Sequence, residues 1–414
     1  MTAFGLTFAL ALAFTTVLKL WLARRQLVYV TAHRAAVPPP FAVDVSLAAH
    51  QRAADYTAAK TRLAIAGTTV DALLAAWLTF GGGLQWLYDL AARGFEPGLP
   101  RELTLIVLFA LVTTAVDLPF SLYRTFVIEQ RFGFNKMTPA LFAADMLKGL
   151  ALGAVLGLPL AACILWLMAV SGEYWWIYAW LVWVGFNTLV LAVYPTWIAP
   201  LFNKFSPLQN DELRVRVERL LARCGFKVKG LMVMDGSRRS SHGNAYFTGF
   251  GSSKRIVFFD TLLAALQPQE VEAVLAHELG HFRLRHVLKR LVWIFGATLA
   301  LLWLIDYLMR QDWFYAGLHV ATPSTAMALL LFFVIAPSFS FLAQPLLSGY
   351  SRRHEFEADR YATEHACARD LSSALVKLYR DNASTLTPDP VHSAFYDSHP
   401  PALQRIERLL RAAA

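Results

Sequence analysis

The chain has 414 residues, of which 57% are hydrophobic and only 16% are charged. Soluble domains carry about 25% charged residues, so this composition excludes an ordinary soluble protein and indicates one that lies in a lipid bilayer. The net charge of +9 could indicate a nucleic-acid-binding protein. However, the Lys and Arg residues lie mainly in loops between apolar stretches, which membrane topology explains better. We therefore expect membrane lipid as a partner and no nucleic acid.

Seven apolar stretches are long enough to cross a bilayer, which takes about 20 residues each. They cover residues 3–22, 63–90, 103–128, 146–170, 174–199, 291–308 and 325–347. The first stretch lacks a basic N-terminal region and a small-residue cleavage site, so we predict a retained span and no signal peptide. The fold class predicted from these stretches is a mainly α integral membrane protein with seven transmembrane helices.

The spans divide the chain into four segments. Residues 1–200 hold five membrane helices with their loops, and residues 291–347 hold helices six and seven. The more polar residues 201–290 and 348–414 are predicted to form together a small α+β domain. Within it, the patterns favour a helix at 210–224, a strand at 228–234, and a hairpin of strands at 244–250 and 254–259.

The distribution of charge predicts the orientation in the membrane. The loops after the first, third and fifth spans and the C-terminal tail are rich in Arg and Lys, whereas the alternate loops carry few cations. By the positive-inside rule the N-terminus lies outside, and the polar domain and the C-terminus lie in the cytoplasm. Frequent Ala, Leu and Arg are typical of a high-GC bacterium, which predicts the bacterial inner membrane; a eukaryotic chain would belong in the endoplasmic reticulum.

A His-Glu-x-x-His motif occupies residues 277–281 of a predicted helix. His277 and His281 lie one helical turn apart, where two imidazoles can bind one metal ion, and Glu278 lies beside that face. Pro268 suits the first turn of this helix, which could continue without a break into the sixth span. The motif alone also occurs by chance on solvated helices. Its apolar flanks and a later acidic cluster favour a zinc hydrolase.

The third zinc ligand is expected in the acidic cluster at residues 355–359, because a catalytic zinc ion takes three protein ligands and a water. Glu355 and Asp359 share one helix face, whereas Glu357 points about 200° away from Glu355. If Glu355 binds zinc, Asp359 can accept the outer N–H of a ligating histidine. If Glu357 were the ligand, its neighbours on the helix would be Arg353 and Tyr361, which support a metal ligand less well. A separate alternative is that the whole cluster is only an exposed charged face of the helix. Glu355 is the predicted ligand.

Two aspartates, Asp71 and Asp117, lie in the second and third predicted spans. Charge is costly in hydrocarbon, so we expect them to face a wet interior or to be satisfied by a neighbouring helix without chemical function.

Four further segments carry a resemblance to a known family. They are Glu-Gln-Arg-Phe-Gly-Phe-Asn-Lys at 129–136, Asn-Ala-Tyr-Phe-Thr-Gly-Phe at 244–250, Ser-Arg-Arg-His-Glu-Phe-Glu-Ala-Asp-Arg-Tyr-Ala at 351–362, and His-Pro-Pro at 399–401 followed by Arg405. With His-Glu-Leu-Gly-His and seven predicted spans, the chain resembles the Ste24 type of CAAX prenyl protease, in the M48 group of zinc metallopeptidases. Phe282 stands where relatives often carry Trp, and we expect no effect on the chemistry.

The resemblance implies a set of roles around one zinc ion per chain. His277, His281 and Glu355 would bind the zinc, Glu278 would be the general base, and Asp359 would support a ligand. The family fold implies a ring of seven helices around a water-filled chamber, with the catalytic domain over its cytoplasmic mouth.

The resemblance also implies residues that contact the substrate. Asn244, Ala245 and Tyr246 would form an edge strand that pairs with the substrate backbone. His399 and Arg405 match residues near the metal and the substrate, and either could donate a hydrogen bond to the oxyanion. Arg405 could instead hold a C-terminal carboxylate of the substrate, or form a salt bridge with a neighbour such as Glu407 or Asp397.

The predicted activity is that of an integral-membrane zinc endopeptidase acting on a peptide partner. The family implies cleavage after a prenylated cysteine, but in a bacterium a quality-control endopeptidase without a prenyl requirement is the alternative. A transporter or channel with a structural metal is an alternative of another class. Glu278 argues against it, because a structural zinc usually has four protein ligands and no adjacent general base.

Overall fold

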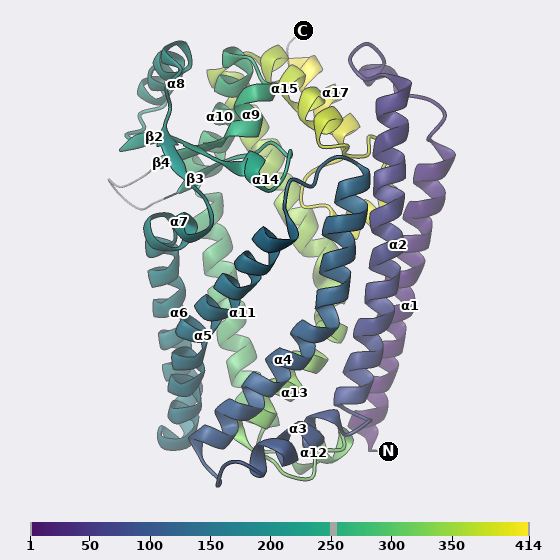
Figure 1. Ribbon diagram of the computed structural model, residues 1–414, viewed down its shortest axis with the longest axis vertical. Helices are drawn as coiled ribbons and strands as arrows, with labels where there is room; N and C mark the ends of the chain where they lie inside the picture. The colour runs from purple at the N-terminus through teal and green to yellow at the C-terminus, as the bar shows by residue number, and fades with distance from the viewer. Residues whose placement is uncertain (1, 249–254, 413–414) are drawn as a thin grey trace.

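The computed structural model describes residues 2–248 and 255–412. Long helices form one part of the molecule, a smaller mixed α/β part lies above them, and the two termini lie at opposite ends (Figure 1). The long helices are α1 (Ala3–Ala32), α2 (Leu47–Leu78), α4 (Leu99–Tyr123), α5 (Pro139–Val170), α6 (Trp175–Val193), α11 (His286–Leu308) and α13 (Thr325–Ser340).

The predicted membrane spans are present, with one difference in shape. In the described residues, six helical runs are long and apolar enough to cross a membrane, and counting the bent pair of α2 and α3 (Gly83–Ala92) as one span makes seven. The second predicted stretch, residues 63–90, falls on the end of α2, which begins at Leu47, and on α3, and the two helices meet at 57°. Glycines at 81–83 explain the bend: Gly82 has φ +70°, which glycine adopts without the cost that a Cβ imposes.

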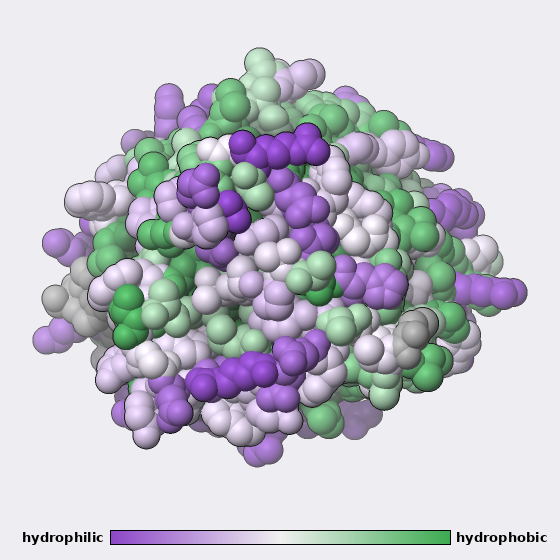
Figure 2. Space-filling model, turned by 90° about the horizontal axis from the view of Figure 1, so that it is seen from below, coloured by the Kyte–Doolittle hydropathy of each residue, from purple (hydrophilic) through white to green (hydrophobic). Residues whose placement is uncertain are grey.

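The sides of the helical part are apolar. Large side chains on the long helices are exposed there, for example Trp293 at 70% and Val155 at 68%. The end of the molecule seen in Figure 2 carries many hydrophilic residues, and hydrophobic ones surround it. An apolar surface of this extent is stable against lipid and not against water. The chain is a multi-pass integral membrane protein, as predicted.

Most of the membrane helices are not packed into a solid bundle. Only 6% of the most apolar window of Leu99–Glu129 and 11% of that of Pro139–Val170 are buried, against 56% for Thr325–His365. A close-packed bundle would bury a stripe along every helix. Asp71 of α2 and Asp117 of α4 are close enough to each other and to Lys19 of α1 to interact electrostatically. The three charges thus face a shared region between helices, which agrees with a wet interior.

The mixed part contains a four-stranded sheet in the order β1 (Phe205–Pro207), β2 (Gly230–Met234), β4 (Arg255–Phe259), β3 (Ala245–Thr248). β2 and β4 are parallel, and the other two pairs are antiparallel. The predicted strand at 228–234 and the predicted hairpin are confirmed; residues 249–254, which join its strands, lie outside the described part. The short β1 was not predicted.

Helices cover this sheet and complete the mixed part. The predicted helix at 210–224 is confirmed as α8 (Asp211–Arg223), and the side chain of Asn210 caps it by accepting a hydrogen bond from the Leu213 amide. The other helices here are α7 (Ala199–Phe202), α9 (Asp260–Ala265), α10 (Pro268–Arg283), α14 (Gln344–His365), α15 (Ala368–Asp381), α16 (Pro390–Tyr396) and α17 (Ala402–Ala412). A six-residue helix, α12 (Asp312–Gly317), lies at the opposite end (Figure 1) and packs against α1.

The motif helix α10 packs against α8, α14 and α15. It begins at Pro268, as predicted, with a capping box formed by Gln267 and Glu270. The expectation of an unbroken helix into the sixth span is wrong, because α10 ends at Arg283. Arg285 has φ +57°, the left-handed region that a side chain with a Cβ disfavours, and α11 begins at the next residue.

The tightest contact between α10 and α14 lies at Gly280. A Cβ built on Gly280 would lie 3.0 Å from the Cα and 3.1 Å from the carbonyl oxygen of Ala358. These are backbone atoms, which cannot rotate away as a side chain would. Glycine at this position therefore sets the separation of the two helices that carry the His-Glu-x-x-His motif and the acidic cluster.

We predict that Gly280→Ala forces α10 and α14 apart by a few tenths of an ångström and destabilises the protein by about 1–3 kcal/mol, the usual cost of overpacking. Thermal unfolding of the purified protein in detergent measures the effect. Gly296→Ala in α11 is the matched control, since a Cβ there meets nothing within 4 Å. Equal melting temperatures for the two variants would contradict the prediction.

Candidate active site

Three side chains from α10 and α14 converge at the base of the mixed part. Nε2 of His277 lies 3.2 Å from Nε2 of His281. Oε1 of Glu355 lies 3.3 Å from Nε2 of His281, and its Oε2 lies 3.5 Å from Nε2 of His277. The side chains of His277 and Glu355 are 8% and 7% exposed. The structure thus brings together the three residues that the sequence proposed as metal ligands.

This geometry fits a tetrahedral metal ion. Zinc bonds to nitrogen and oxygen of about 2.0–2.1 Å give a tetrahedron whose edges are roughly 3.3 Å. The two Nε2 atoms lie 3.2 Å apart, close to one such edge, and each faces a different oxygen of the Glu355 carboxylate, at 3.3 or 3.5 Å. Oε2 of Glu355 is also buried without a hydrogen-bond donor among the described residues. Nη1 of Arg405 lies 3.7 Å from this oxygen, beyond hydrogen-bond distance, so a bound cation would satisfy it. The donor set of two imidazoles and one carboxylate is that of a catalytic zinc site with one open position.

A carboxylate and a guanidinium support His277 from behind. Nδ1 of His277 lies 2.8 Å from Oδ1 of Asp359, and Arg405 donates two hydrogen bonds to Asp359, at 2.6 and 2.9 Å. Burial opposes protonation of His277, but the hydrogen bonds with Asp359 and Glu355 outweigh burial and raise its pKa to about 9. Burial likewise opposes the charge on Arg405, and Asp359 holds the pKa of Arg405 above its usual range.

A second group of contacts, behind His281, was not predicted. Nδ1 of His281 lies 3.0 Å from Nδ1 of His286, and Nε2 of His286 lies 3.1 Å from Oε2 of Glu357. The ring of His354 stacks on that of His286, with centroids 4.0 Å apart. The sequence signal was a histidine five positions after His281 and a third acid beside Glu355. Helical-wheel reasoning could not join them, since it placed Glu357 on another face than Glu355 and assigned no role to His286.

Glu278 lies next to the two histidines on α10 and is partly exposed. Within the described residues its carboxylate makes no hydrogen bond or ion pair, and it is not one of the three converging groups. A carboxylate with no structural partner, adjacent to a metal-ligand cluster, is available to accept a proton from a water molecule.

The structure places His399 and Arg405 differently. His399 lies in the loop between α16 and α17; its side chain is 63% exposed, and its Nε2 lies 3.5 Å from Oε1 of Glu355. The side chain of Arg405 is 5% exposed, and its partner is Asp359, with Glu355 at 3.7 Å. Neither of the partners considered from the sequence, Glu407 and Asp397, forms this pair. His399 can thus reach a bound molecule, whereas Arg405 faces the ligand helix.

The residues proposed to bind substrate lie at the edge of the sheet. Ala245 and Tyr246 are the first residues of β3, and Asn244 precedes them. In the described residues β3 pairs with β4 alone, with Tyr246 opposite Val257, so its other edge has no partner strand. β3 also contacts α10. An extended peptide could therefore add to this edge next to the metal-ligand cluster.

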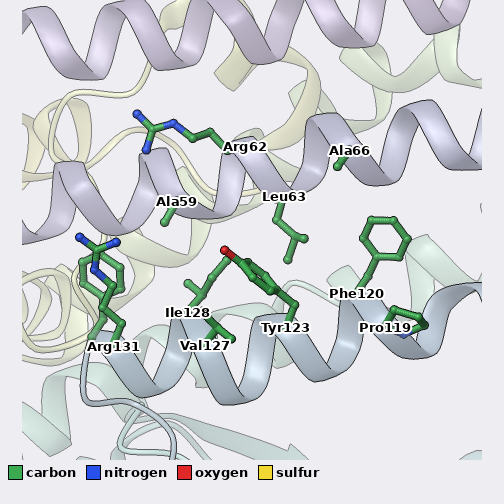
Figure 3. A pocket seen from close by; sticks show the side chains of 11 residues that line it. Ala59, Arg62, Leu63, Ala66, Pro119, Phe120, Tyr123, Val127, Ile128 and Arg131 are labelled. Atoms are coloured by element: carbon green, nitrogen blue, oxygen red, sulfur yellow. The ribbon is translucent and has the colours of Figure 1, made fainter.

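A pocket of about 450 Å³ opens between α2 and the end of α4 with its π-helical extension η2 (Arg124–Glu129). Two arginines lie at one end of it and apolar side chains at the other (Figure 3). It is lined by Ala59, Arg62, Leu63, Ala66, Pro119, Phe120, Tyr123, Val127, Ile128, Arg131 and Phe132. None of the metal-ligand residues lines it, so it is a separate feature of the membrane part.

Side chains next to this pocket contact the segment before β3. The hydroxyl of Tyr56 on α2 donates to Glu129 of η2 at 2.6 Å, and Nε2 of His242 lies 3.6 Å from the same carboxylate. The His242 ring stacks on Phe134, with centroids 4.3 Å apart. His242 lies two residues before Asn244, so this cluster fixes the membrane helices against the edge strand.

Comparisons with known proteins agree along the whole chain. Residues 26–204 match the family model described as CAAX prenyl protease N-terminal, five membrane helices, and residues 207–413 match that of peptidase family M48. The chain is 38% identical over 350 residues to a CAAX prenyl protease 1 homolog of Arabidopsis thaliana, covering 82% of both chains. It is 33% identical over 374 residues to a CAAX prenyl protease 1 homolog of Homo sapiens, covering 79% of both.

A solved structure shares the fold over nearly the full length. The crystal structure of S. mikatae Ste24p superposes with a TM-score of 0.93 at 28% sequence identity, and 99% of each chain is covered. The predicted fold class and the resemblance to the Ste24 type are thus confirmed. The chain belongs to the Ste24-type CAAX prenyl proteases of the M48 zinc metallopeptidase family.

Proposed function

We propose that this metallopeptidase holds one zinc ion with His277, His281 and Glu355 and hydrolyses peptide bonds at that site. The observation that carries the proposal is the convergence of the two Nε2 atoms and the Glu355 carboxylate at separations of 3.2–3.5 Å. Zinc, when bound, supplies a Lewis acid that lowers the pKa of a water molecule toward about 7.

The chain's own residues supply the remaining steps. Glu278 accepts a proton from the attacking water and returns it to the leaving amine, since its carboxylate has no other partner in the described structure. The free edge of β3 at Ala245 and Tyr246 pairs with the substrate backbone and presents the scissile bond to Glu278. His399, exposed beside Glu355, donates a hydrogen bond to the developing oxyanion.

Arg405 takes another role in this proposal. Its guanidinium is buried and bound to Asp359 by two hydrogen bonds, so it holds the carboxylate that orients His277. Because two of its N–H groups bind Asp359 and its side chain is only 5% exposed, Arg405 supports the ligand helix in this proposal and is not placed to bind a substrate carboxylate.

Variants of the motif test the mechanism. Glu278→Gln should retain one zinc per chain and lower kcat by about a thousandfold, because the metal ligands remain while the proton acceptor is lost. His277→Ala should lose both zinc and activity. Metal analysis and peptide cleavage by the same purified samples give both readings. Wild-type turnover in Glu278→Gln would remove Glu278 from the mechanism.

The organisation of the chain supports a single catalytic domain built from two segments. Buried residues between Leu208 and Leu279 and between Ala362 and Leu409 belong to one hydrophobic cluster. We propose that residues 201–290 and 348–414 form this domain, and that residues 1–200 and 291–347 form the membrane part. The Arg-rich and Lys-rich loops support a cytoplasmic location for the domain and an outside location for the N-terminus.

The proposed substrate is a CAAX-type peptide that carries an isoprenoid on its cysteine. The relatives named CAAX prenyl protease 1 support this choice. The pocket between α2 and η2 supports it as well, because its apolar wall at Leu63, Phe120 and Val127 suits an isoprenoid chain. Glu129, which follows the pocket residues Val127 and Ile128, accepts a hydrogen bond from Tyr56 and lies 3.6 Å from His242, shortly before β3, the strand proposed to hold the peptide.

The substrate class is tested with a farnesylated CAAX peptide and its unmodified twin. We expect kcat/KM to be at least about tenfold higher for the farnesylated peptide, the effect of roughly 1.4 kcal/mol of apolar contact. Mass spectrometry of the products locates the cut site. Equal kcat/KM values would favour a quality-control endopeptidase without a prenyl requirement.

Filling the pocket tests where the isoprenoid lies. Ala66→Trp places an indole in the pocket and should raise KM for the farnesylated peptide by about tenfold, with no change for the unmodified twin. Ala64→Trp is the matched control, because Ala64 is exposed on the same helix but does not line the pocket. Equal KM changes for the two peptides would place the isoprenoid elsewhere.

A further inference from the structure

The break between α10 and α11 brings His286 to His281. On an unbroken helix, a residue five positions after His281 would lie about 140° around the axis from it. In the structure the chain turns at Arg285, whose φ is +57°, and the two Nδ1 atoms lie 3.0 Å apart. His286 is buried, at 4% exposure. The unfavourable backbone conformation of Arg285 thus occurs where it places the imidazole of His286 against that of His281.

The contacts of His286 determine which nitrogen of each ring carries a proton. Nε2 of His286 faces the Glu357 carboxylate at 3.1 Å, and a carboxylate only accepts, so this nitrogen carries the hydrogen. In a neutral ring the Nδ1 of His286 is then an acceptor, and Nδ1 of His281 must donate to it. His281 is left with a lone pair on Nε2, the atom that faces His277 and Glu355.

We propose that Glu357, acting through His286, holds His281 in the tautomer and orientation that present Nε2 to the metal, so that His286 and Glu357 are positioning residues. The inference rests on the proposed role of His281 as a metal ligand. It parallels the other side of the site, where Asp359 accepts directly from His277 at 2.8 Å. Such partners of ligating histidines commonly change metal affinity by about 10–100-fold when they are removed.

The contacts behind His277 and those behind His281 each end on an arginine. Arg405 binds Asp359, and Arg353 donates to Glu357 at 3.1 Å. The arginines keep the two carboxylates charged and therefore good acceptors. Arg353 is 78% exposed, however, and Arg405 is 5% exposed. The His281 side is thus the more accessible of the two.

A second metal site is the competing interpretation of the same residues. Single ligand atoms of His286, His354 and Glu357 lie within 4.8 Å of one another. Both nitrogens of His286 already face partners at hydrogen-bond distance, Nδ1 toward His281 and Nε2 toward Glu357. An ion bound at His286 would displace one of these bonds. The positioning role accounts for both contacts, and metal stoichiometry separates the two interpretations.

The test compares His286→Phe, which keeps an aromatic ring but has no acceptor, with His354→Phe, which keeps the stacked ring outside the hydrogen-bond path. Zinc dissociation constants are measured by chelator competition on the purified full-length protein, and cobalt-substituted samples give visible absorption spectra. We expect His286→Phe to bind zinc about 10–100-fold more weakly, with an altered cobalt spectrum. His354→Phe should differ from wild type by less than about threefold.

Two further variants guard against a purely structural effect. His286→Asn places an amide oxygen near the position of Nδ1 and should recover most of the zinc affinity. Glu357→Gln offers His286 an amide that can donate as well as accept, so the tautomer is no longer fixed. We expect a smaller loss there, of about 3–10-fold, which gives a result even if His286→Phe does not fold.

Several outcomes would overturn the proposal. Wild-type zinc affinity in both His286→Phe and Glu357→Gln would show that the contacts do not act on His281. Two zinc ions per wild-type chain, falling to one in His354→Phe, would make His286 a ligand. If wild type binds no zinc, the proposed function fails with it, whereas one wild-type zinc with unaffected variants rejects only the positioning role.

Discussion

The site depends on the close approach of two helices at Gly280. α10 carries both histidines and α14 carries the carboxylates, and their backbones touch where Gly280 meets Ala358. The axes of two packed helices usually lie about 8–10 Å apart, and the size of the side chains at the crossing sets this distance. Without a Cβ at the crossing, Glu355 can reach two imidazole nitrogens one helical turn apart. Gly280 in His-Glu-Leu-Gly-His is thus required for helix packing, whereas the two histidines are required for metal binding.

Three acids of α14 serve three different tasks although they lie within five residues. Glu355 faces both histidines, Asp359 lies behind His277, and Glu357 meets His281 through His286. α14 can supply partners to both histidines because α10 crosses it and because the sharp turn before α11 brings His286 to His281. The structure keeps each acid charged by pairing it with cations or with N–H donors. The polar residues buried here are therefore arranged around the metal-ligand residues. As isolated salt bridges they would contribute little to folding stability.

Apolar runs and helical spacing were sufficient to predict the spans, the motif helix and the grouping of Glu355 with Asp359. They failed where tertiary contacts overrode local pattern. A hydropathy window averages over Gly82 and so missed the bend between α2 and α3. Leu284 and Arg285 include no glycine or proline, so nothing local indicated the break that brings His286 to His281. The partner of Arg405 was sought near it in sequence, whereas Asp359 lies on another helix.

The path of the chain couples metal-site geometry to the membrane. α10 leads directly into α11, and α13 leads through a short 3-10 turn into α14, so each ligand helix continues from a membrane helix. Two crossings separate the ligands in sequence, which returns α14 to the side on which α10 lies. A shift of α11 against α13 therefore changes the position of His281 relative to Glu355. Gly280 holds α10 and α14 in close contact, so the two ligand helices are joined both to each other and, through the chain, to α11 and α13.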